Sequence, residues 1–428
     1  MNVYLGIDLG STTSKAVMID DTGAIIGRGI TNTRSDYTVA AEIARMDAEF
    51  DSRFSLLRQR VADGDGHADG WSEVFRSLEN RFYYLQFRRR YETLASTMIE
   101  RAQGDRQPRI GLVDKLQAAL PQVHDSVRAR FMRGEVSNSS EFFRDLFSGT
   151  FMKTIDQYDR ATFDELVAVY DRSINPVENQ LVTFDFVDLL TQALELMPDE
   201  FASSREIIAR HVPDVASVTR EPADYIGTGY GRQLLPFEQK HIKSEILCHA
   251  LGAHAFFPGT RTVLDIGGQD TKAIQVDEQG LVTSFQMNDR CAAGCGRYLG
   301  YIADEMSISV SELGPLAMGA TYETNICSTC TVFAGAELRE QLNLGERKEN
   351  VLAGLHLAIV QRAFALLARS GGVRNEFTFT GGVARNQAVV KYVSNMTRQN
   401  YGDVSINIHP DSIFMGALGA AIFCLRRS

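Results

Sequence analysis

The chain has 428 residues, of which 44% are hydrophobic and 23% charged, which is typical of a soluble globular protein with two or three domains. Its net charge of −10 argues against a nucleic-acid binder, because phosphate contacts call for a basic face. The first residues enter a strand without a charged and apolar leader, and we find no apolar run long enough to span a bilayer. We therefore expect a cytoplasmic protein without a nucleic-acid or membrane partner, in which reduced cysteines serve metal binding or catalysis more often than disulfides.

The N-terminal segment has the pattern of a β-hairpin with a glycine-rich turn. Val3–Asp8 is a short apolar strand, and Lys15–Asp20 is its predicted partner across a Gly-Ser-Thr-Thr-Ser turn. A second turn, Asp21–Gly23, leads into a third predicted strand over Ala24–Gly29. We therefore expect three short, connected strands here.

From Thr31 to about Val182 the composition changes to a helical pattern rich in Arg, Asp, Phe and Tyr. Two apolar stripes at helical spacing predict two long helices, and by default their side chains form a core. The stripes consist of Ile43, Met46, Phe50, Phe54 and Leu57, and of Trp71, Phe75, Leu78, Phe82 and Leu85. The segment between them, Asp63–Gly70, lacks the glycine and glutamate of a calcium loop and is interpreted as a flexible linker.

The strand–turn–strand pattern of the N-terminus returns at Val263–Asp277. The corresponding pairs are Asp8 with Asp265, Gly10 with Gly267, Asp20 with Asp277 and, once a one-residue gap is allowed, Lys15 with Lys272. Repetition of one supersecondary unit this far along the chain predicts two related subdomains.

The segments that flank the second repeat also carry structural signals. Strand character resumes near Asp224, and a helix is predicted from about Glu238 to Ala255. A third glycine turn lies at Phe379–Asn386, and a helix rich in small residues is predicted over Phe414–Leu425. On these helices we interpret Cys248, His249 and Cys424 as packing residues.

Four of the six cysteines lie in two clusters, Cys291-Ala-Ala-Gly-Cys295 and Cys327-Ser-Thr-Cys330. Each cluster precedes a segment with helical periodicity, and thiols at a helix start lie where free N–H groups and the helix dipole favour a thiolate. A soft metal site is therefore expected. Structural zinc is the alternative, but the 31 residues between the clusters exceed the usual zinc-ribbon spacing. Cys295 and Cys327 individually are more readily explained as packed thiols than as ligands.

The two glycine hairpins can hold phosphate and magnesium together. Backbone N–H groups and hydroxyls of a turn bind phosphate oxygens, and the carboxylates Asp8 and Asp265 would reach Mg²⁺, through water because magnesium dehydrates reluctantly. Neither hairpin fits a P-loop or a dinucleotide fingerprint. We expect the polyphosphate of ATP to be bound by Gly10, Ser11, Thr12, Thr13, Lys15, Gly267, Gly268, Gln269, Gly381 and Gly382.

These motifs resemble a known superfamily. Gly6–Thr13, Asp265–Gly268 and Thr380–Gly382 look like the two phosphate segments and the adenosine segment of the actin, hexokinase and Hsp70 ATPases. More narrowly, Ser244–His249, Met287–Gly294 and Ser328–Phe333 resemble the ATPase activators of 2-hydroxyacyl-CoA dehydratases and benzoyl-CoA reductases. The resemblance covers roughly residues 1–33 and 220–428.

The resemblance implies a [4Fe–4S] cluster shared between two subunits, to which each subunit gives one cysteine from each segment. Carried over to this chain, the ligands are Cys291 and Cys330. The extra cysteines Cys295 and Cys327 depart from the pattern of the small activators. The long helical insert, with Gly29–Ser35 before it, most resembles the larger ATP-binding subunit of benzoyl-CoA reductase.

The resemblance implies an α/β fold with two duplicated subdomains and a nucleotide cleft between them. We expect the first subdomain to comprise 1–33 and 183–255, an α-helical insert 34–182, and the second subdomain 256–428 with the cysteine segments. The predicted function is the ATP-hydrolysing electron-activation subunit of a benzoyl-CoA reductase, which passes electrons from reduced ferredoxin to a catalytic partner.

Because one chain carrying two assigned ligands cannot complete a four-thiolate cluster, a second chain is required. A symmetric homodimer would satisfy the ligand count. The insert adds roughly 150 residues with two apolar stripes, which we expect a partner to cover. We therefore predict pairing with a related, shorter ATPase subunit and docking on two catalytic subunits. Three alternatives stay open: an activator of a 2-hydroxyacyl-CoA dehydratase, a small-molecule kinase of the same fold, and a chaperone-like ATPase.

Overall fold

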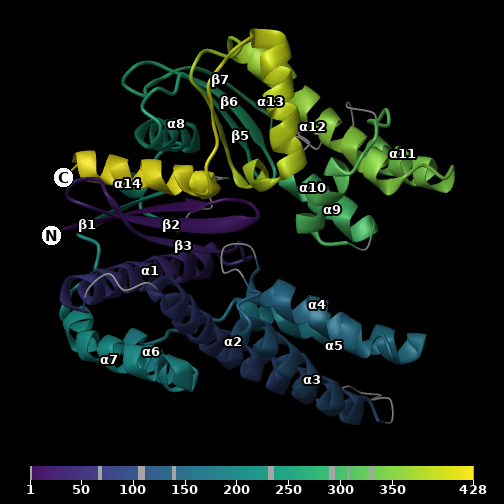
Figure 1. Ribbon diagram of the computed structural model, residues 1–428. Coiled ribbons are helices and arrows are strands. Elements are labelled where there is room, and N and C mark those ends of the chain that lie inside the picture. Colours follow the sequence, from purple (N-terminus) through teal and green to yellow (C-terminus); the bar gives the residue numbers. More distant parts are fainter. Residues whose placement is uncertain are drawn as a thin grey trace. The chain divides into compact units, whose positions relative to one another are not determined.

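The computed structural model describes residues 2–65, 70–104, 111–136, 141–229, 236–288, 295–306, 308–326 and 331–427 (Figure 1). The chain divides into two compact units, one formed by Met1–Arg28 with Pro222–Ser428 and the other by Gly29–Glu221. The first unit contains the strands of two sheets, and the second is built from helices. Residues 183–221, which the sequence assigned to the first ATPase subdomain, lie in the helical unit. The three-part division itself remains a prediction.

The N-terminal sheet has the strand order β3-β2-β1-β4. Its strands are β1 (Val3–Leu9), β2 (Thr13–Asp20), β3 (Ile25–Asn32) and β4 (Asp224–Gly229). The first two form an antiparallel hairpin, and β4 pairs with β1 in parallel. All three predicted N-terminal strands are therefore confirmed.

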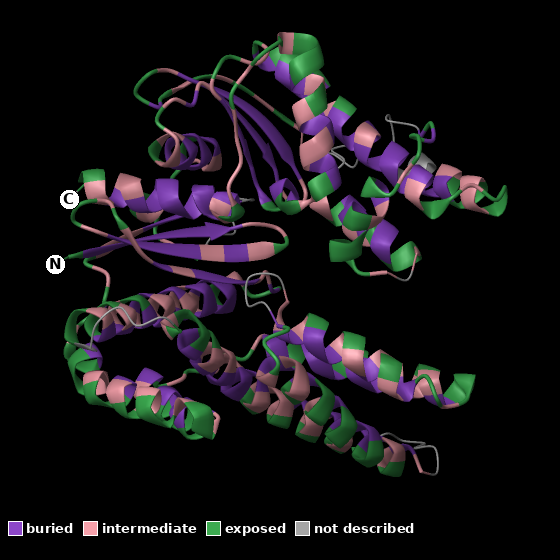
Figure 2. Cartoon of the chain, viewed as in Figure 1, coloured by how far each residue is buried: buried purple, intermediate pink, exposed green. Residues whose placement is uncertain are grey.

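The second sheet has the order β7-β6-β5-β8-β9. Its strands are β5 (Thr262–Ile266), β6 (Thr271–Val276), β7 (Val282–Asn288), β8 (Phe377–Thr380) and β9 (Ile406–Asn407). Side chains alternate between its two faces, as strand geometry requires. Leu264 and Ala273 join one buried cluster, whereas Val263 and Ile274 join another with helix α8 (Glu245–Phe256). Figure 2 shows that β1, β5, β6 and β8 are buried, whereas the residues of the edge strand β7 alternate between half-buried and exposed.

The two hairpins have the same register. Asp8 lies opposite Lys15 in the β1–β2 pair, and Asp265 lies opposite Lys272 in the β5–β6 pair. Each lysine follows its aspartate by seven positions (15 − 8 and 272 − 265). The duplication is therefore confirmed, and the one-residue gap between Lys15 and Lys272 was wrong.

In the described part of the chain, five α-helices lie between β7 and β9 in sequence. They are α9 (Gly296–Glu305), α10 (Val310–Met318), α11 (Thr331–Asn343), α12 (Lys348–Ser370) and α13 (Gln387–Tyr401). Both cysteine clusters thus precede helices, as predicted. In α9, Leu299, Ile302 and Ala303 are buried on one side of the helix, which confirms the helical periodicity predicted after the first cluster.

Helix α8 and the C-terminal helix α14 (Met415–Arg427) cross with their backbones in contact. A Cβ atom on Gly252 of α8 would lie 2.0 Å from the carbonyl oxygen of Met415, and one on Gly419 of α14 would lie 1.8 Å from that of Cys248. Only glycine at both positions permits this approach. Cys248 and Cys424 are buried, as predicted for packing residues.

The predicted helix from Glu238 to Ala255 is interrupted. A 3₁₀ turn spans Gln239–His241, and α8 starts only at Glu245. Between them, Ile242 bridges to Gly227 of β4, and the backbone N–H of Lys243 donates to the Gly227 carbonyl. Because these residues extend the sheet, they are excluded from a helix.

Helix α12 has 23 residues with a mean hydropathy of 1.8 in its most apolar window, and by length and composition it is apolar enough to cross a membrane. The expectation that no such run exists was therefore wrong. Of that window, 72% is buried inside the protein, and α12 packs on β6, β7 and α13. We interpret it as a core helix.

The second unit contains seven α-helices in its described part. They are α1 (Tyr37–Asp65), α2 (Trp71–Gly104), α3 (Leu112–Met132), α4 (Phe143–Ile155), α5 (Arg160–Glu178), α6 (Phe186–Glu195) and α7 (Ala202–Ser217), with a 3₁₀ turn at Asp199–Phe201 before α7. One core joins α1, the first half of α2, α6 and α7, and a second joins the rest of α2 to α3, α4 and α5. Helix α2 therefore connects the two cores.

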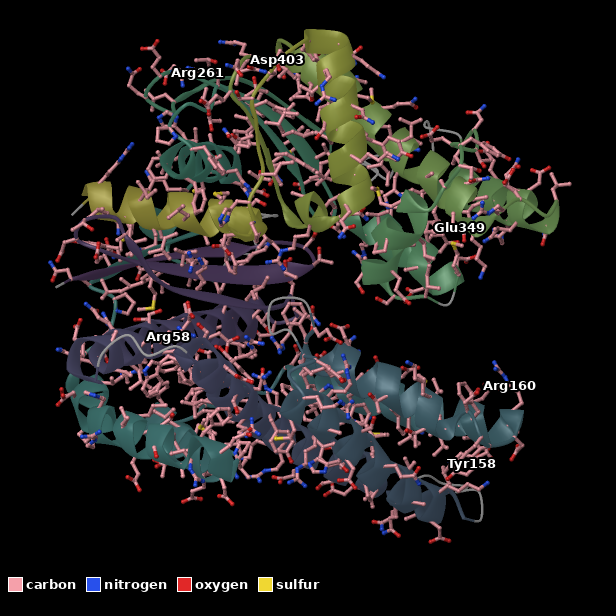
Figure 3. All side chains as sticks on the ribbon, in the orientation of Figure 1. Arg58, Tyr158, Arg160, Arg261, Glu349 and Asp403 are labelled. Atoms are coloured by element: carbon pink, nitrogen blue, oxygen red, sulfur yellow. The ribbon has the colours of Figure 1, made fainter. Side chains whose placement is uncertain are left out.

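The two predicted stripes pack together. The ring of Phe82 in α2 lies 5.2 Å from that of Phe50 and 5.0 Å from that of Phe54, both edge to face. Arg58 of α1, labelled in Figure 3, lies over the ring of Phe75 at 5.4 Å. The core prediction is thus confirmed. The linker prediction was wrong for Asp63–Asp65, which belong to α1, and residues 66–69 lie outside the described part of the chain.

Candidate active site

The two glycine hairpins touch each other. A Cβ atom on Gly268 would lie 1.6 Å from the Thr12 hydroxyl and 3.0 Å from that of Ser11, so the two turns approach where only a glycine fits. Gln269 occupies the same turn as Gly268 and is half-buried, whereas Thr12 is exposed. The structure thus brings together the two halves of the predicted phosphate site.

In the first hairpin, Asp8 has a free carboxylate oxygen. Its Oδ2 lies 3.6 Å from Nζ of Lys15, while its Oδ1 is buried without a hydrogen-bond partner. Lys15 is half-buried, and its Nζ would lie 3.1 Å from a Cβ atom on Gly10. A buried oxygen that lacks a donor is suited to a metal-bound water.

In the second hairpin, Lys272 binds three carboxylates. Its Nζ lies 2.7 Å from Asp270 Oδ1, 2.8 Å from Glu245 Oε1 and 3.4 Å from Asp265 Oδ2. Burial acts to lower the pKa of Lys272, but these carboxylates raise it above the ordinary value. Burial favours neutral Asp265, but His249 and Lys272 hold the pKa of Asp265 well below its usual range.

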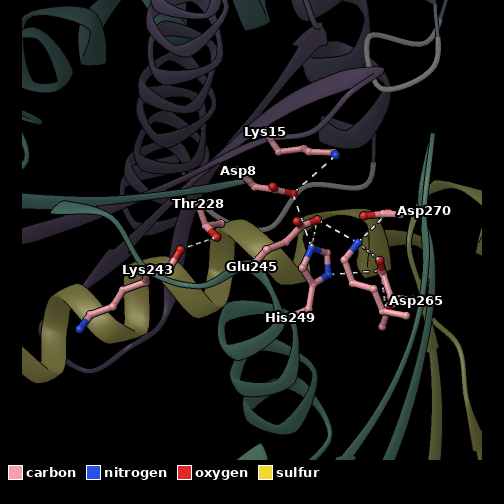
Figure 4. A network of polar contacts seen from close by, with 10 residues as sticks. Asp8, Lys15, Thr228, Lys243, Glu245, His249, Asp265 and Asp270 are labelled. Atoms are coloured by element: carbon pink, nitrogen blue, oxygen red, sulfur yellow. Dashed lines mark hydrogen bonds and ion pairs between the residues drawn. The ribbon is translucent and has the colours of Figure 1, made fainter. Parts of the chain in front are cut away.

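His249 lies between the carboxylates of the two repeats. Its Nδ1 is 3.2 Å from Asp265 Oδ1, and its Nε2 is 3.9 Å from Asp8 Oδ2 and 4.0 Å from Glu245 Oε1 (Figure 4). Burial opposes the charged imidazole, yet the Asp265 carboxylate outweighs burial and raises the pKa of His249. The prediction that His249 only packs was therefore wrong. The signal that would have found it is its spacing of four residues from Glu245, which places both side chains on one face of α8.

The third glycine turn contacts the second hairpin. The Thr380 hydroxyl donates to Asp265 Oδ1 at 2.8 Å. Gly381 has a φ of +89°, and a Cβ atom there would lie 2.3 Å from the Ile266 carbonyl oxygen. Gly382 then begins a 3₁₀ turn, Gly382–Arg385. The third turn thus lies at the Asp265 end of the polar network.

Magnesium fits this site on the Asp8 side. Both oxygens of Asp265 already contact side chains of the protein, whereas Oδ1 of Asp8 has no hydrogen-bond partner. Within the described ranges, no group of three or more His, Cys, Asp or Glu side chains is placed to hold a metal ion by itself. A magnesium ion at Asp8 would keep several waters and use phosphate oxygens as ligands.

The second hairpin is bonded to the helix that follows the first cysteine segment. The backbone N–H of Gly296 donates to the Gly267 carbonyl at 2.9 Å, and that of Arg297 donates to the Gly268 carbonyl at 2.8 Å. These bonds satisfy two of the free N–H groups in the first turn of α9. Cys295 precedes the helix in an extended conformation. A direct backbone connection therefore joins the phosphate site to the cysteine segment.

Of the four central cysteines, only Cys295 is described. It is buried at 7% exposure, and burial raises the pKa of its thiol. Cys291, Cys327 and Cys330 lie outside the described residues, and two of them, Cys291 and Cys330, are the predicted ligands. Helix α11 begins at Thr331, directly after the second segment.

Helices α9 and α11, which follow the two cysteine segments, are linked to each other. Arg339 Nη1 lies 2.6 Å from Glu305 Oε2, and the ring of Tyr301 lies against Gly335. Most of the exposed large hydrophobic residues in the described part of the chain lie between positions 281 and 344. Eight of the ten are Leu281, Phe285, Met287, Tyr301, Val310, Met318, Tyr322 and Leu344. Along the sequence they therefore lie on both sides of the cysteine segments, whereas the helical unit has only Leu181 of the ten.

Curated relatives match about half of this chain. The chain is 41% identical over 211 residues to the activator of lactoyl-CoA dehydratase from Anaerotignum propionicum, a match of 49% of this chain and 79% of the relative. It is 32% identical over 208 residues to a benzoyl-CoA reductase component from Thauera aromatica, which covers 49% of this chain and 73% of that relative.

Solved structures support the predicted fold. The activator of 2-hydroxyisocaproyl-CoA dehydratase from Clostridium difficile, with bound ADPNP, superimposes with a TM-score of 0.52 at 21% identity, over 99% of this chain and 95% of that one. The duplicated α/β ATPase fold of the actin and hexokinase type is thereby confirmed. The model of the BadF/BadG/BcrA/BcrD ATPase family matches residues 5–424. The chain therefore belongs to the BadF/BadG/BcrA/BcrD ATPase family.

Proposed function

We propose that the chain is an ATP-hydrolysing activator that passes low-potential electrons from reduced ferredoxin to a 2-hydroxyacyl-CoA dehydratase in the cytoplasm. The observation that carries the proposal is the pair of backbone hydrogen bonds between the second phosphate hairpin and α9. A kinase would have no use for such a connection to a cysteine segment. The higher identity to a dehydratase activator than to a benzoyl-CoA reductase component favours this partner over the one expected from the sequence.

In this proposal the two hairpins bind the polyphosphate of ATP. Lys15 offers its ammonium beside Gly10, and the hairpin N–H groups with Ser11 and Thr12 complete the donors. Mg²⁺, when bound, neutralises charge on the phosphate oxygens, and Asp8 would hold it through water. Asp265 and His249 lie on the opposite side, where they can orient the water that attacks the terminal phosphate.

A structural change on ATP hydrolysis would be transmitted to the cysteine segments through α9. A change in the turn Gly267–Gly268 pulls on the first two N–H groups of α9, and the Arg339–Glu305 ion pair carries the movement to α11. Shifting a two-state element from 1:99 to 99:1 takes about 5.5 kcal/mol, which nucleotide exchange can supply. Both helices would thus change their angle to the segments that hold a cluster.

The cluster itself is proposed to be a [4Fe–4S] centre held by Cys291 and Cys330 together with two thiolates of a second ATPase chain. It would supply one-electron chemistry at low potential. Buried Cys295 is better suited to packing than to ligation. The exposed apolar residues around the cysteine segments provide the surface on which a second chain can pack.

The second chain need not be a different, shorter subunit. The apolar stripes of the helical unit turn inward into its own cores, so they give no reason for an unlike partner. Two copies of this chain satisfy the ligand count with the commonest symmetry. Native mass spectrometry of the protein purified under anaerobic conditions distinguishes a homodimer with a full cluster from a chain that needs a shorter partner.

A benzoyl-CoA reductase with two catalytic subunits is the second candidate. The observation that favours it is the 32% identity to a benzoyl-CoA reductase component, which is matched over 73% of its length. Reconstitution with each class of partner separates the two. Electron transfer to a dehydratase, measured as dehydration of a 2-hydroxyacyl-CoA, supports the proposal, whereas transfer only to a ring-reducing partner overturns it.

Gly296→Pro tests the connection itself. Proline is favoured at the first position of a helix, and Cys295 before it is extended, so the change removes the hydrogen bond to Gly267 at small cost to the helix. We expect G296P to bind ATP and retain the iron–sulfur spectrum but to lose at least about tenfold in partner reduction per ATP hydrolysed, about 1.4 kcal/mol of coupling. Gly296→Ala, which keeps the N–H, is the matched control. Equal coupling in both variants would contradict the mechanism.

A further inference from the structure

Lys15 and Lys272 occupy equivalent positions of the repeat but differ in their contacts. We propose that Lys272 is a built-in countercation that fixes the carboxylates of the second hairpin, and that Lys15 alone is free to bind phosphate. The proposal rests on the nucleotide site described above and assigns a positioning residue within it.

Lys272 has no donor left for a ligand. Its side chain is 1% exposed, and its three ammonium hydrogens match the three carboxylates of Asp265, Asp270 and Glu245 at 2.7 to 3.4 Å. Three carboxylates gathered around one point repel one another unless a cation lies among them. Lys272 supplies that cation from within the chain.

Lys15 is placed differently, although its register is the same. Its side chain is 11% exposed, and its one close carboxylate among the described residues, Asp8, is 3.6 Å away. An approaching phosphate oxygen meets the ammonium of Lys15 above Gly10. Above the corresponding Gly267 it meets Asp270 Oδ1, which would lie 2.9 Å from a Cβ atom there.

One substitution between the repeats accounts for the difference. Aligned on their aspartates and lysines, the hairpins place Thr13 of the first where Asp270 stands in the second. A threonine hydroxyl can donate to phosphate, whereas a carboxylate repels phosphate and attracts the lysine. Because Lys272 binds Asp270, its ammonium is not available to the nucleotide. We therefore assign the divalent ion to Asp8, whose Oδ1 has no hydrogen-bond partner.

Lys272→Met tests the countercation without nucleotide, ferredoxin or catalytic partner. Removing the ammonium leaves three carboxylates together, so K272M should bind about one additional Mn²⁺ per chain relative to wild type in an EPR titration. The double variant K272M/D270N, with one carboxylate fewer, should lose most of that gain. Wild-type Mn²⁺ binding in K272M would overturn the proposal. Mn²⁺ binding is measured without electron transfer, so this test of Lys272 is independent of whether the chain is an activator.

The affinity for Mg·ATP provides a second test of the proposal. We expect Lys15→Met to weaken Mg·ATP binding by at least about tenfold, and Thr13→Asp to weaken it similarly because the new carboxylate engages Lys15 as Asp270 engages Lys272. T13D leaves Lys272 and its partners intact, so it tests the difference between the two lysines even where K272M does not fold. Wild-type Mg·ATP affinity in T13D, or in K15M, would refute the division between the lysines.

Discussion

Nδ1 of His249 lies 3.2 Å from Oδ1 of Asp265, and through this contact helix α8 joins the second glycine hairpin. The other ring nitrogen faces Asp8 of the first hairpin at 3.9 Å. A single imidazole therefore stands between the corresponding carboxylates of a duplicated fold.

His249→Asn should lower the rate of ATP hydrolysis by about 10²-fold, because the shorter amide cannot reach both carboxylates and the site loses its alignment. Steady-state phosphate release measures the effect. His254→Asn, on the same helix but outside the polar network, is the matched control. Hydrolysis at the wild-type rate in H249N would show that the imidazole is dispensable for positioning.

Asp8→Asn and Asp265→Asn should both reduce ATP hydrolysis by about 10²-fold or more while the cluster spectrum is retained. Their effects on stability should differ. Asp265 contacts His249, Lys272 and Thr380, and removing one partner of a buried ion pair costs about 3–5 kcal/mol. Asp8 has an unpartnered oxygen, so D8N should be milder.

Urea unfolding of the two variants, with Asp277→Asn in the outer turn as control, measures the difference in stability. Equal destabilisation by D8N and D265N would contradict the inequivalence of the two carboxylates. Unchanged hydrolysis in both variants would remove the nucleotide site from the hairpins.

Cys291→Ser and Cys330→Ser should each abolish the iron–sulfur EPR signal, whereas Cys295→Ala and Cys327→Ala should keep most of it. For Cys295 the reason is structural, because its thiol is buried in the core beside α9. EPR of the dithionite-reduced protein, with iron and sulfide analysis, makes the comparison. If all four variants lose the signal equally, one cysteine per segment is the wrong assignment.

His356 should make stability depend on pH. It is fully buried, its Nδ1–H donates to the Leu352 carbonyl at 2.6 Å, and burial lowers its pKa to about 4. The unfolded state takes up this proton below a pH of about 6.5 and the folded state only below about 4, so the free energy of unfolding rises with pH across that window.

Between pH 7 and pH 5 this one group should cost the wild type about 2 kcal/mol of stability. His356→Gln lacks the titration, so its unfolding free energy should fall less over the same interval. The difference between the two pH dependences, from urea denaturation, isolates the histidine. Parallel losses in wild type and H356Q would argue against it.

Features that depend on local sequence could be predicted. The hairpins, the repeat and the helices after the cysteines follow from alternation, turn residues and helical periodicity, and the stripe of Phe50 and Phe54 packs against Phe82 as its spacing indicated. Here the local pattern and the tertiary structure favour the same answer.

Features that depend on docking could not be predicted. His249 contacts Asp8 and Asp265 only because α8 lies beside two hairpins that are distant in sequence. Helix α8 begins at Glu245 and not at the predicted Glu238, because Ile242 pairs with β4. The division of the insert into two cores connected by α2 likewise depends on tertiary packing, which periodicity does not specify. Of the predicted site, the positions of Cys291 and Cys330 remain predictions.

The crossing of α8 and α14 has a consequence for variation in this chain. Gly252 and Gly419 take no part in the polar network, yet any side chain there would strike a backbone carbonyl of the opposite helix. A saturation mutagenesis experiment should therefore find these two glycines as intolerant as Asp8. Positions that tolerate no substitution would therefore include the glycines of this helix contact as well as the residues of the candidate active site.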